Sequence, residues 1–396
     1  MIIPILTIAL GLATLLWLLP CGTLLWEVVW AAAGKAGAAP AGSLPEGLKL
    51  AVLMPAHDEA QGIVATIQGL LPALRSQDQI LVVADNCSDE TAVLARRAGA
   101  TVVERFSTDQ RGKGYALDYG LQQLSSDPPD VVILMDADCT CQVHTLMHLA
   151  SHALATQRPV QANYLIEQPP ATSLKGFISA FAIKVKNFVR PLGLQRLGWP
   201  CLLTGTGIAL PWSAATAVTI ASGHIAEDMK WGLDLALAGY PPTFLPTARV
   251  LSRLPSQEDA ATVQRTRWEH GHLQIMGAYL PRLLGQALRQ SRLDLLALAL
   301  ELGILPLSLL VMTWGALTLA TLVFALISAS WLPLQLAGLA GAALFTAVML
   351  AWYRYGRSDL SWRQLVMIPI YMLWKIPLYL AFLMRPEKRW VRTRRD

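Results

Sequence analysis

The residues best suited to do chemistry in this chain are Asp136 and Asp138, which follow the apolar run 131–135. A buried parallel strand of that composition would deliver both carboxylates at its end, where they could hold a divalent metal against a diphosphate. The same residues could also only cap the next helix, because carboxylates are common there. Other acidic groups favour the metal interpretation: Asp85 earlier in the chain, and Glu227 with Asp228 later.

Short apolar strands and amphipathic helices alternate between residues 49 and 155, and they would position these groups. This alternation is typical of an α/β domain with a mainly parallel sheet covered by helices on both faces. In such sheets, ligands bind beyond the carboxyl ends of the strands. The expected strands are 49–54, 80–84, 101–104 and 131–135, and the expected helices are 60–75, 90–98, 112–124 and 143–155.

Polar residues follow three of the expected strands at the point where each one ends, at 55–59, 85–89 and 136–138. Each segment alone has a purely structural interpretation, since Asp58, Glu59 or Ser88 could begin the following helix. The ends of parallel strands, however, meet at one edge of a sheet. We therefore expect the three segments to form one site.

Both ends of the chain are hydrophobic, and they predict membrane helices on either side of the α/β domain. Of 396 residues, 54% are hydrophobic and 15% are charged. Residues 1–33 should form an uncleaved transmembrane helix, because no basic segment precedes the apolar run as it would in a signal peptide. The expected order continues with a linker at 34–48, the α/β domain at 49–290, transmembrane and interfacial helices at 291–384, and a basic tail at 385–396.

The C-terminal hydrophobic region predicts two spans and one helix at the membrane surface. The spans are expected at roughly 302–328 and 333–353. Arginines between 354 and 363 and in the tail should both be cytoplasmic by the positive-inside rule. A full span at 365–384 would separate these basic segments, so we expect an interfacial or re-entrant helix there, broken by Pro369 and Pro377. The α/β domain would then lie in the cytoplasm at the plasma membrane, which in a bacterium is the inner membrane.

The charge distribution, the cysteines and the histidines argue against nucleic-acid binding, a disulfide framework and a zinc or histidine metal site. The net charge of +5 comes largely from the tail, which favours anionic lipid headgroups rather than nucleic acid as a partner. Five cysteines without framework spacing fit a reducing compartment. Cys139 and Cys141 have the wrong spacing for a zinc knuckle. A histidine stripe on one helix lacks an acidic partner and is not expected to bind metal; it consists of His144, His148 and His152.

Seven motifs occur in order along residues 49–275: 52–59, 84–91, 111–117, 136–138, 204–207, 227–228 and 264–268. With these motifs the chain resembles family 2 glycosyltransferases with the GT-A fold. The later motifs resemble the membrane-embedded branch that includes cellulose, hyaluronan and chitin-oligosaccharide synthases and ceramide glucosyltransferase. None of the motifs is specific alone, but the ordered set is. The resemblance implies a GT-A nucleotide-sugar-binding domain flanked by N- and C-terminal transmembrane helices.

The resemblance also implies a site for a nucleotide sugar, with UDP as the expected nucleotide. Pro55, Asp58 or Glu59, and Asp85 would frame the nucleotide. Asp85 would accept a hydrogen bond from the uracil ring. Lys113 would lie near the base or the phosphates, and the glycines beside it allow a close approach because they carry no Cβ.

The same resemblance implies a metal site and a general base. The diphosphate gains charge as the glycosidic bond breaks, and a cation held by Asp138 and Asp136 would stabilise it. Carboxylates suit Mg²⁺ or Mn²⁺ better than zinc, and Asp136 would also orient the donor ribose or sugar. Asp228 is the expected general base, with Glu227 supporting it or capping a helix. One base opposite the leaving group implies inversion at the anomeric carbon. The alternative is that both residues only begin a helix.

The acceptor side is expected along 264–268. Gln264, Arg267 and Trp268 would share one face of a helix, because they are spaced at i, i+3 and i+4. Trp268 would form the acceptor platform and Arg267 would meet the leaving phosphate. An interfacial helix would favour the same residue types. In the family, the acceptor side also includes a segment that could otherwise be only a turn: Gly205, Thr206 and Gly207.

These expectations describe a membrane-bound, metal-dependent, inverting glycosyltransferase. It would transfer a sugar, expected to come from a UDP-sugar, to a lipid or lipid-linked oligosaccharide in glycolipid or exopolysaccharide synthesis. The alternative is a processive polysaccharide synthase, which must enclose a polar polymer within the bilayer and would need more spans, a homo-oligomer or an export partner. A catalytically silent scaffold that binds nucleotide sugar belongs to another class of function. It has no support, because the acidic residues and Trp268 are all present.

Overall fold

The computed structural model describes residues 2–34, 46–167, 174–253 and 258–384. The chain divides into two compact units, and each is described by itself. The described residues of the sheet unit are 46–167, 199–253 and 258–275, and those of the helical unit are 2–34, 174–198 and 276–384. Most of the expected linker at 34–48 and all of the expected basic tail at 385–396 lie outside the described residues.

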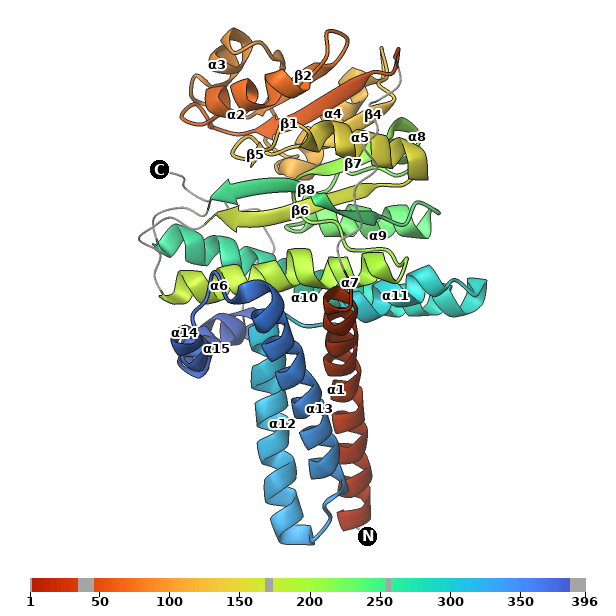
Figure 1. Ribbon diagram of the computed structural model, residues 1–396, viewed down its shortest axis with the longest axis vertical. Helices are drawn as coiled ribbons and strands as arrows, with labels where there is room; N and C mark the ends of the chain where they lie inside the picture. The colour runs from red at the N-terminus through yellow and green to blue at the C-terminus, as the bar shows by residue number, and fades with distance from the viewer. Residues whose placement is uncertain (1, 35–45, 168–173, 254–257, 385–396) are drawn as a thin grey trace. The chain divides into compact units, whose positions relative to one another are not determined.

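The sheet unit is built on one eight-stranded sheet (Figure 1). Its strands lie in the order β3-β2-β1-β4-β7-β6-β8-β5. The strands from β3 to β4 are parallel to one another, whereas β7 is antiparallel to both β4 and β6. The bounds are β1 Leu50–Ala56, β2 Gln79–Asp85, β3 Thr101–Arg105, β4 Val131–Leu134, β5 Thr140–Cys141, β6 Val160–Glu167, β7 Ile208–Pro211 and β8 Thr243–Arg253.

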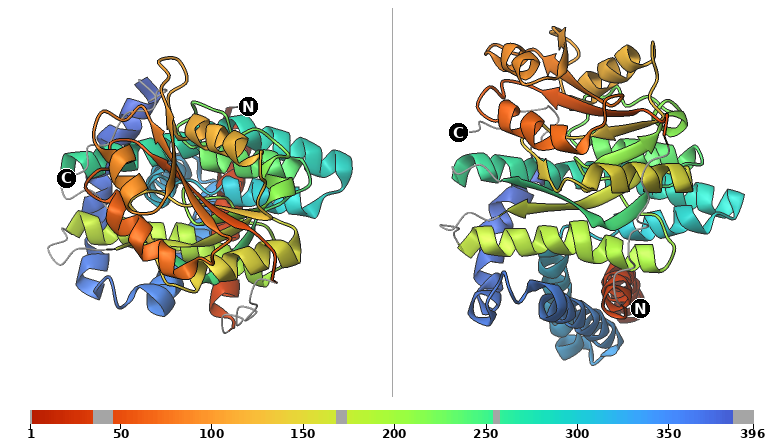
Figure 2. Two further views of the ribbon diagram at one scale, coloured as in Figure 1. Left: turned by 90° about the horizontal axis from the view of Figure 1, so that it is seen from above. Right: turned by 45° about the horizontal axis from the view of Figure 1, so that its top comes forward.

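Helices cover both faces of this sheet (Figure 2), because the central strands are apolar on both sides. Val52 packs on one face with Ile63 and Leu146, and Leu53 packs on the other face with Leu117. Alternation along a strand sends successive side chains to opposite faces. The helices are α2 Ile63–Leu70, α3 Thr91–Arg97, α4 Lys113–Leu124, α5 Thr145–Thr156, α8 Trp212–Ala215 and α9 Glu227–Leu237.

The predicted alternation of strands and helices is confirmed, and the four expected strands match within two residues. The helix expected at 60–75 is shorter than predicted and covers only Ile63–Leu70. A loop precedes it, in which Asp58 has a φ of 52°. The helix ends early because a separate 3₁₀ turn that contains Pro72 follows, η1 Leu71–Ala73.

The helical unit contains three helices long and apolar enough to cross a membrane: Ile3–Ala32, Leu307–Ser328 and Leu332–Gly356. These agree with the three predicted spans. They correspond to α1 Ile2–Ala32, α12 Leu307–Ser328, and α13 Leu332–Ala351 with the π-helical turn η3 Trp352–Gly356. Both α1 and α12 pack against α13 (Figure 1). The unit also holds α6 Leu174–Lys184, the π-helical turn η2 Val185–Val189, α7 Arg190–Arg196, the end of α10 Glu258–Gln290, and α11 Leu293–Leu302.

The segment 365–384 forms two helices, α14 Trp362–Val366 and α15 Ile368–Met384. The expected break near Pro369 is confirmed, because α14 and α15 separate at the residue before Ile368. The expected break at Pro377 is wrong, since α15 continues through it. A proline removes one backbone hydrogen bond, and the packing of α15 against α6 and α12 keeps the helix intact. Whether α15 crosses a membrane stays a prediction.

Candidate active site

The polar segments after β1, β2 and β4 lie at one edge of the sheet. β1 lies between the other two strands, with Ala56 in register with Ala84 and Leu53 in register with Leu134. The carboxyl ends of the three strands are therefore neighbours. The loop 204–207 reaches the same edge, because the Gly207 N–H donates to the Leu134 carbonyl at 2.9 Å.

Lys113 is the positive centre of this edge. Its Nζ forms an ion pair with Asp136 and donates a hydrogen bond to the Gly205 carbonyl at 2.7 Å. Burial alone would lower the pKa of Lys113, but the negative charges of Asp136 and of the acidic pair at the start of α9 outweigh burial and raise that pKa. The side chains of Lys113 and Asp136 are 19% and 27% exposed, so a ligand can reach them. A phosphate could therefore take the place of Asp136 on this ammonium group.

Asp136, Asp138 and Cys139 bring one potential ligand atom each within 4.8 Å of one another. The Asp136 N–H donates to Thr206 Oγ1 at 2.9 Å, which fixes the backbone of the motif. Two carboxylates at this spacing fit Mg²⁺ or Mn²⁺, which prefer oxygen ligands. The Cys139 thiol is buried, and burial together with the charges of the two aspartates raises its pKa. A protonated thiol leaves the carboxylates as the ligands of a hard cation.

The loop 204–207 has a shape that only glycine permits. Gly207 has a φ of 67°, and a Cβ there would lie 2.8 Å from the Ala162 Cβ on β6. The neighbouring Gln161 holds the loop from both sides. Its Oε1 accepts from the Thr204 N–H at 2.7 Å, and its Nε2 donates to the Thr206 carbonyl at 3.0 Å. The loop is thus a fixed part of the sheet edge rather than a free turn.

Glu227 and Asp228 begin α9, where the helix N-terminus favours acidic side chains. Asp228 Oδ2 also accepts a hydrogen bond from the Gly205 N–H, so its carboxylate belongs to the same edge as Lys113. Burial, and then the charge of Asp228, raises the pKa of Glu227 to about 7, while Lys113 and Arg267 act in the opposite direction. The pair therefore begins a helix and also contributes charge to the site.

The N-terminal part of α10 packs on the start of α9. A Cβ on Gly271 would lie 2.9 Å from the Cβ of the residue that precedes α9, so the two helices touch there. The expected helix at 264–268 is part of α10. Gln264 is buried, and within the described ranges its Oε1 has no hydrogen-bond partner. Arg267 lies close enough to Glu227 to influence its pKa, and Trp268 is half-buried.

Asp85, expected at the nucleotide base, ends β2 beside a buried arginine. Its Oδ1 pairs with Arg105 Nη1 at 2.7 Å, and both side chains are at most 10% exposed. Asn86 Nδ2 donates to the same oxygen at 3.2 Å, and His57 Nδ1 lies 2.6 Å from the Asp85 carbonyl oxygen. This carboxylate is held in place before any ligand arrives.

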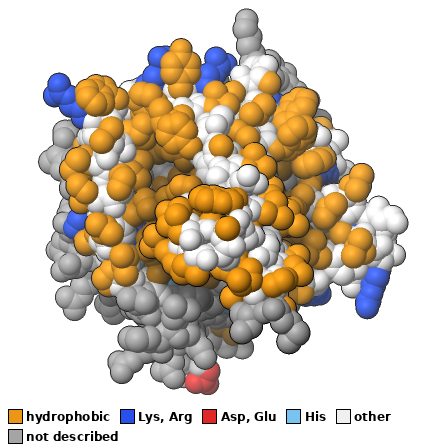
Figure 3. Space-filling view, turned by 90° about the horizontal axis from the view of Figure 1, so that it is seen from below, with side chains coloured by type: hydrophobic (Ala, Val, Ile, Leu, Met, Phe, Trp, Pro, Cys, Tyr) orange, Lys and Arg blue, Asp and Glu red, His pale blue; other side chains and the backbone are white. Residues whose placement is uncertain are grey.

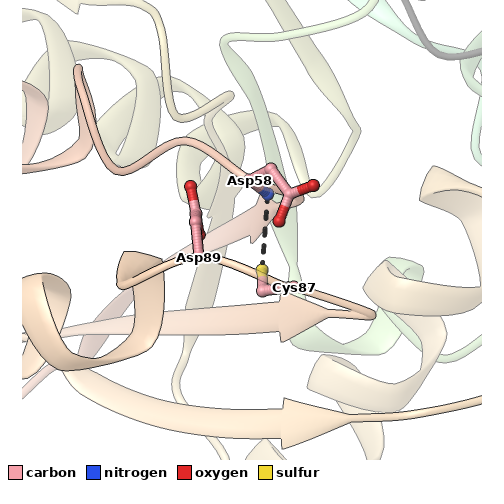
Figure 4. A group of neighbouring side chains, drawn as sticks. All are labelled: Asp58, Cys87 and Asp89. Atoms are coloured by element: carbon pink, nitrogen blue, oxygen red, sulfur yellow. Dashed lines mark hydrogen bonds between the residues drawn. The ribbon is translucent and has the colours of Figure 1, made fainter.

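Asp58, Cys87 and Asp89 form a second group with potential ligand atoms within 4.8 Å of one another, shown in Figure 4. The Asp58 N–H points to Cys87 Sγ at 3.5 Å, and Asp58 Oδ1 accepts from the Ser88 N–H at 2.6 Å. Asp89 accepts from two backbone N–H groups at 2.9 and 3.2 Å. These carboxylates connect the loops after β1 and β2, and that structural role accounts for their closeness.

Pro55 and Glu59, expected to frame the nucleotide, lie on either side of Asp58. Pro55 is part of β1 and stands in register with Val83 of β2. The Glu59 N–H donates to Thr91 Oγ1 at 2.7 Å. Both residues therefore belong to the paired loops at this end of the sheet.

Sequence reasoning missed three residues at the site. Arg105 ends β3 at the same edge, and an expected strand one residue longer would have identified it. Gln161 and Tyr164 lie on β6. The Tyr164 hydroxyl shares a hydrogen bond with Ser252 Oγ at 2.7 Å, and burial, followed by the charges around the metal motif, raises its pKa. A polar residue between the apolar Val160 and Ala162 was the available signal for Gln161.

The histidine stripe lies away from the potential metal ligands. His144 precedes α5, and its ring stacks on that of His148 with centroids 6.1 Å apart. Among the residues that the structure describes, the groups with clustered ligand atoms do not include these histidines. Burial lowers the pKa of His152, with a further contribution from Arg158.

Two family models match the sequence. The model of the glycosyl transferase family group 2 matches residues 131–384, and the model of glycosyl transferase family 2 matches residues 51–178.

Curated relatives match over part of their length. The chain is 24% identical over 245 residues to the probable glycosyltransferase YdaM of Bacillus subtilis, which covers 59% of this chain and 57% of that protein. It is 34% identical over 102 residues to a low-salt glycan biosynthesis hexosyltransferase of Haloferax volcanii. This match covers 25% of this chain and 23% of that protein. The chain thus spans less than two thirds of either relative.

A solved structure resembles nearly the whole chain. It is a mannosyltransferase from Pyrobaculum calidifontis in complex with GDP-Man and Mn²⁺, with a TM-score of 0.54 and 16% sequence identity. The likeness covers 96% of this chain and 99% of that one. At this level of identity it establishes the fold.

Proposed function

This chain belongs to the glycosyl transferase family group 2, and from that premise we propose that it is a membrane-bound, inverting enzyme acting on a lipid or lipid-linked glycan. The expected GT-A-like α/β fold with long apolar helices at both ends is confirmed. Membership of this family supports a glycosyltransferase that takes its sugar from a nucleotide sugar. The donor base, the acceptor and the roles of individual residues are our proposals.

The observation that carries the proposal is a continuous polar network across the sheet edge. Asp136 pairs with Lys113, Lys113 donates to the Gly205 carbonyl, and the Gly205 N–H donates to Asp228. One peptide segment therefore links the residue proposed to hold the donor with the residue proposed to activate the acceptor. Such fixed spacing suits a reaction in which the two substrates must meet in line.

The donor would lie against the ends of β1, β2 and β4. Asp85 can accept a hydrogen bond from the ring N–H of uracil, and guanine presents a comparable ring N–H. We favour a UDP-sugar, and a GDP-sugar is the second candidate because the solved relative holds GDP-Man. Lys113 would bind the phosphates. Asp136 and Asp138 would hold Mg²⁺ or Mn²⁺, which supplies charge neutralisation for the leaving diphosphate.

Asp228 would remove the proton from the acceptor hydroxyl as that oxygen attacks the anomeric carbon. The Gly205 N–H bonds one of its carboxylate oxygens and so orients the group. Attack from the face opposite the diphosphate inverts the anomeric configuration. Glu227 would support Asp228, Arg267 would meet the leaving phosphate, and Trp268 with Gln264 would line the acceptor side.

The acceptor is proposed to be a lipid or lipid-linked oligosaccharide, with the sheet unit in the cytoplasm at the plasma membrane. Three candidate spans in the described residues favour this over a processive synthase, which must shield a polar polymer from lipid. The motif at 264–268 keeps the synthase as the second candidate, because polymer-forming relatives share it.

Incubation of the purified full chain with a panel of radiolabelled UDP- and GDP-sugars and a lipid extract tests this function. We expect label from one donor to enter a chloroform-soluble product. Label in ethanol-insoluble material would instead indicate a polymer. Donor binding without any product would identify a silent scaffold and contradict the proposal.

A further inference from the structure

α15 has one buried polar face in the helical unit. Tyr371, Lys375 and Tyr379, spaced at i, i+4 and i+8, are at most 6% exposed. The Tyr371 hydroxyl shares a hydrogen bond with Ser179 Oγ of α6 at 2.8 Å, and the Tyr379 hydroxyl shares one with Ser308 Oγ of α12 at 2.6 Å. These bonds determine which side of α15 faces its neighbours.

Apolar side chains of α14 and α15 are exposed, and so is Arg363 of α14. Trp362, Val366, Ile370 and Leu373 are 62%, 66%, 59% and 66% exposed. Trp362 and Val366 share one face of α14, and Ile370 and Leu373 share one face of α15, so each helix contributes one part of this apolar stripe. Figure 3 shows hydrophobic side chains over most of the described surface, seen from the end toward which α1, α12 and α13 extend.

This stripe lies at the level where the candidate spans end. Ser308 is the second residue of α12, so α15 is attached at the beginning of that span. At the ends of α13 and α1, Arg354 Nη2 donates to the Ala32 carbonyl at 3.0 Å. α12 and α13 are joined by a short loop, so the beginning of α12 and the end of α13 lie at the same boundary. An apolar stripe held there is typical of a helix in the plane of a membrane surface.

Two lysines each contact an aromatic ring of α15, and Lys375 does so on the buried face of that helix. Lys175 Nζ of α6 lies 4.2 Å from the centroid of the Trp374 ring, and Lys375 Nζ lies 5.4 Å from that of Tyr371. The two rings are 5.9 Å apart. Aromatic side chains and lysines of this kind occupy the headgroup level of membranes, where the ammonium group can reach phosphate while the stem stays in apolar surroundings.

We propose that α6, α14 and α15 form a binding site for an anionic phospholipid. The apolar stripe enters the acyl region of one leaflet, and Lys175 binds the phosphate of the headgroup. A positive charge at the headgroup level favours an anionic lipid over a zwitterionic one. This site is independent of the nucleotide-sugar site, since all of its residues lie in the helical unit.

Native mass spectrometry of the full chain, purified in detergent with equal amounts of phosphatidylglycerol and phosphatidylcholine, tests the site. We expect the wild type to retain phosphatidylglycerol preferentially. Lys175→Gln should weaken that retention about fivefold and leave phosphatidylcholine unchanged, because it removes one charge near the headgroup. Lys175→Arg should retain the lipid. Lys49→Gln is the matched control, because it removes an exposed lysine of the sheet unit.

Two outcomes would overturn the proposal. One is unchanged lipid selectivity in Lys175→Gln, and the other is complete displacement of phosphatidylglycerol by millimolar inorganic phosphate, which would identify a free-anion site. Lys375 is buried, so its replacement also affects folding, and Lys175 is therefore the primary position. A bimane label on Leu373→Cys gives a second reading. Lipids carrying a quencher in the acyl chain should quench it, whereas a water-soluble quencher should have little effect.

Discussion

The two units of this chain each hold a cluster of opposite charges, and the clusters differ in exposure. In the helical unit, Arg190 pairs with Glu27 at 3.2 Å and with Glu301 at 2.8 Å, and all three side chains are at most 6% exposed. In the sheet unit, Lys113 and Asp136 are 19% and 27% exposed. A sealed cluster cannot exchange its partners for a ligand, whereas an open one can. The first therefore holds α1, α7 and α11 together, and the second is suited to binding substrate.

The largest expected effect is on folding, at the sealed cluster. Arg190→Met leaves two buried carboxylates without their cation, which costs about 3–5 kcal/mol of stability. We expect the variant to accumulate poorly and to unfold at a much lower temperature in detergent. Arg292→Met is the control, because its ion pair with Asp294 is more exposed and should contribute about 1 kcal/mol at most. Equal stability of both variants would remove the distinction between the clusters.

The next effect is on catalysis, at the open site. Asp228→Asn should reduce kcat by roughly 10²-fold or more and change donor affinity only a few-fold, because a general base acts in the transition state. Asp234→Asn, farther along α9, is the matched control and should stay active. Loss of donor binding with an unchanged kcat would contradict the role of Asp228 and leave Glu227 as the candidate base.

A smaller effect is expected at Asp85. Asp85→Asn should raise KM for the donor about tenfold with little change in kcat. The reason is that a contact to the nucleotide base is present in both the ground state and the transition state. Thermal unfolding must be measured as well, since Arg105 would lose its charged partner. An unchanged KM in a folded variant would mean that the nucleotide base does not bind at Asp85.

The smallest effect concerns pH and Glu227. Its pKa is raised from 4.5 to about 7, so the folded chain holds this proton more tightly than the unfolded chain does. The contribution of Glu227 to stability should therefore fall as the pH rises from 4.5 to about 7, and it should stay constant at higher pH. In Glu227→Gln the melting temperature should change less between pH 5 and 8 than in the wild type. Identical slopes would show that Glu227 has an ordinary pKa.

Local sequence patterns predicted the sheet half of the molecule well. The apolar strands and the glycines beside Lys113 can be recognised from a few consecutive residues. The convergence of the strand ends follows from parallel pairing alone. The three long apolar helices followed from hydropathy for the same reason.

The remaining contacts depend on residues far apart in the chain. Glu27 looked like one charge in an apolar helix, and its pairing with Arg190 joins residues separated by 163 positions. The bonds from Gln161 to the loop 204–207 likewise need the tertiary fold. The continuity of α15 through Pro377 depends on neighbouring helices and not on propensity. Packing between distant segments decided each of these cases.

The central claim is that Asp136 and Asp138 hold a divalent cation needed for sugar transfer. Its most direct test is transfer by the purified full chain in excess EDTA, after addition of Mg²⁺ or Mn²⁺, and in a folded Asp138→Asn variant. We predict that EDTA abolishes transfer and that either cation restores it in the wild type. With either cation present, transfer by Asp138→Asn should stay at least about 10²-fold below that of the wild type. Full transfer in excess EDTA, or wild-type activity in Asp138→Asn, would contradict the claim.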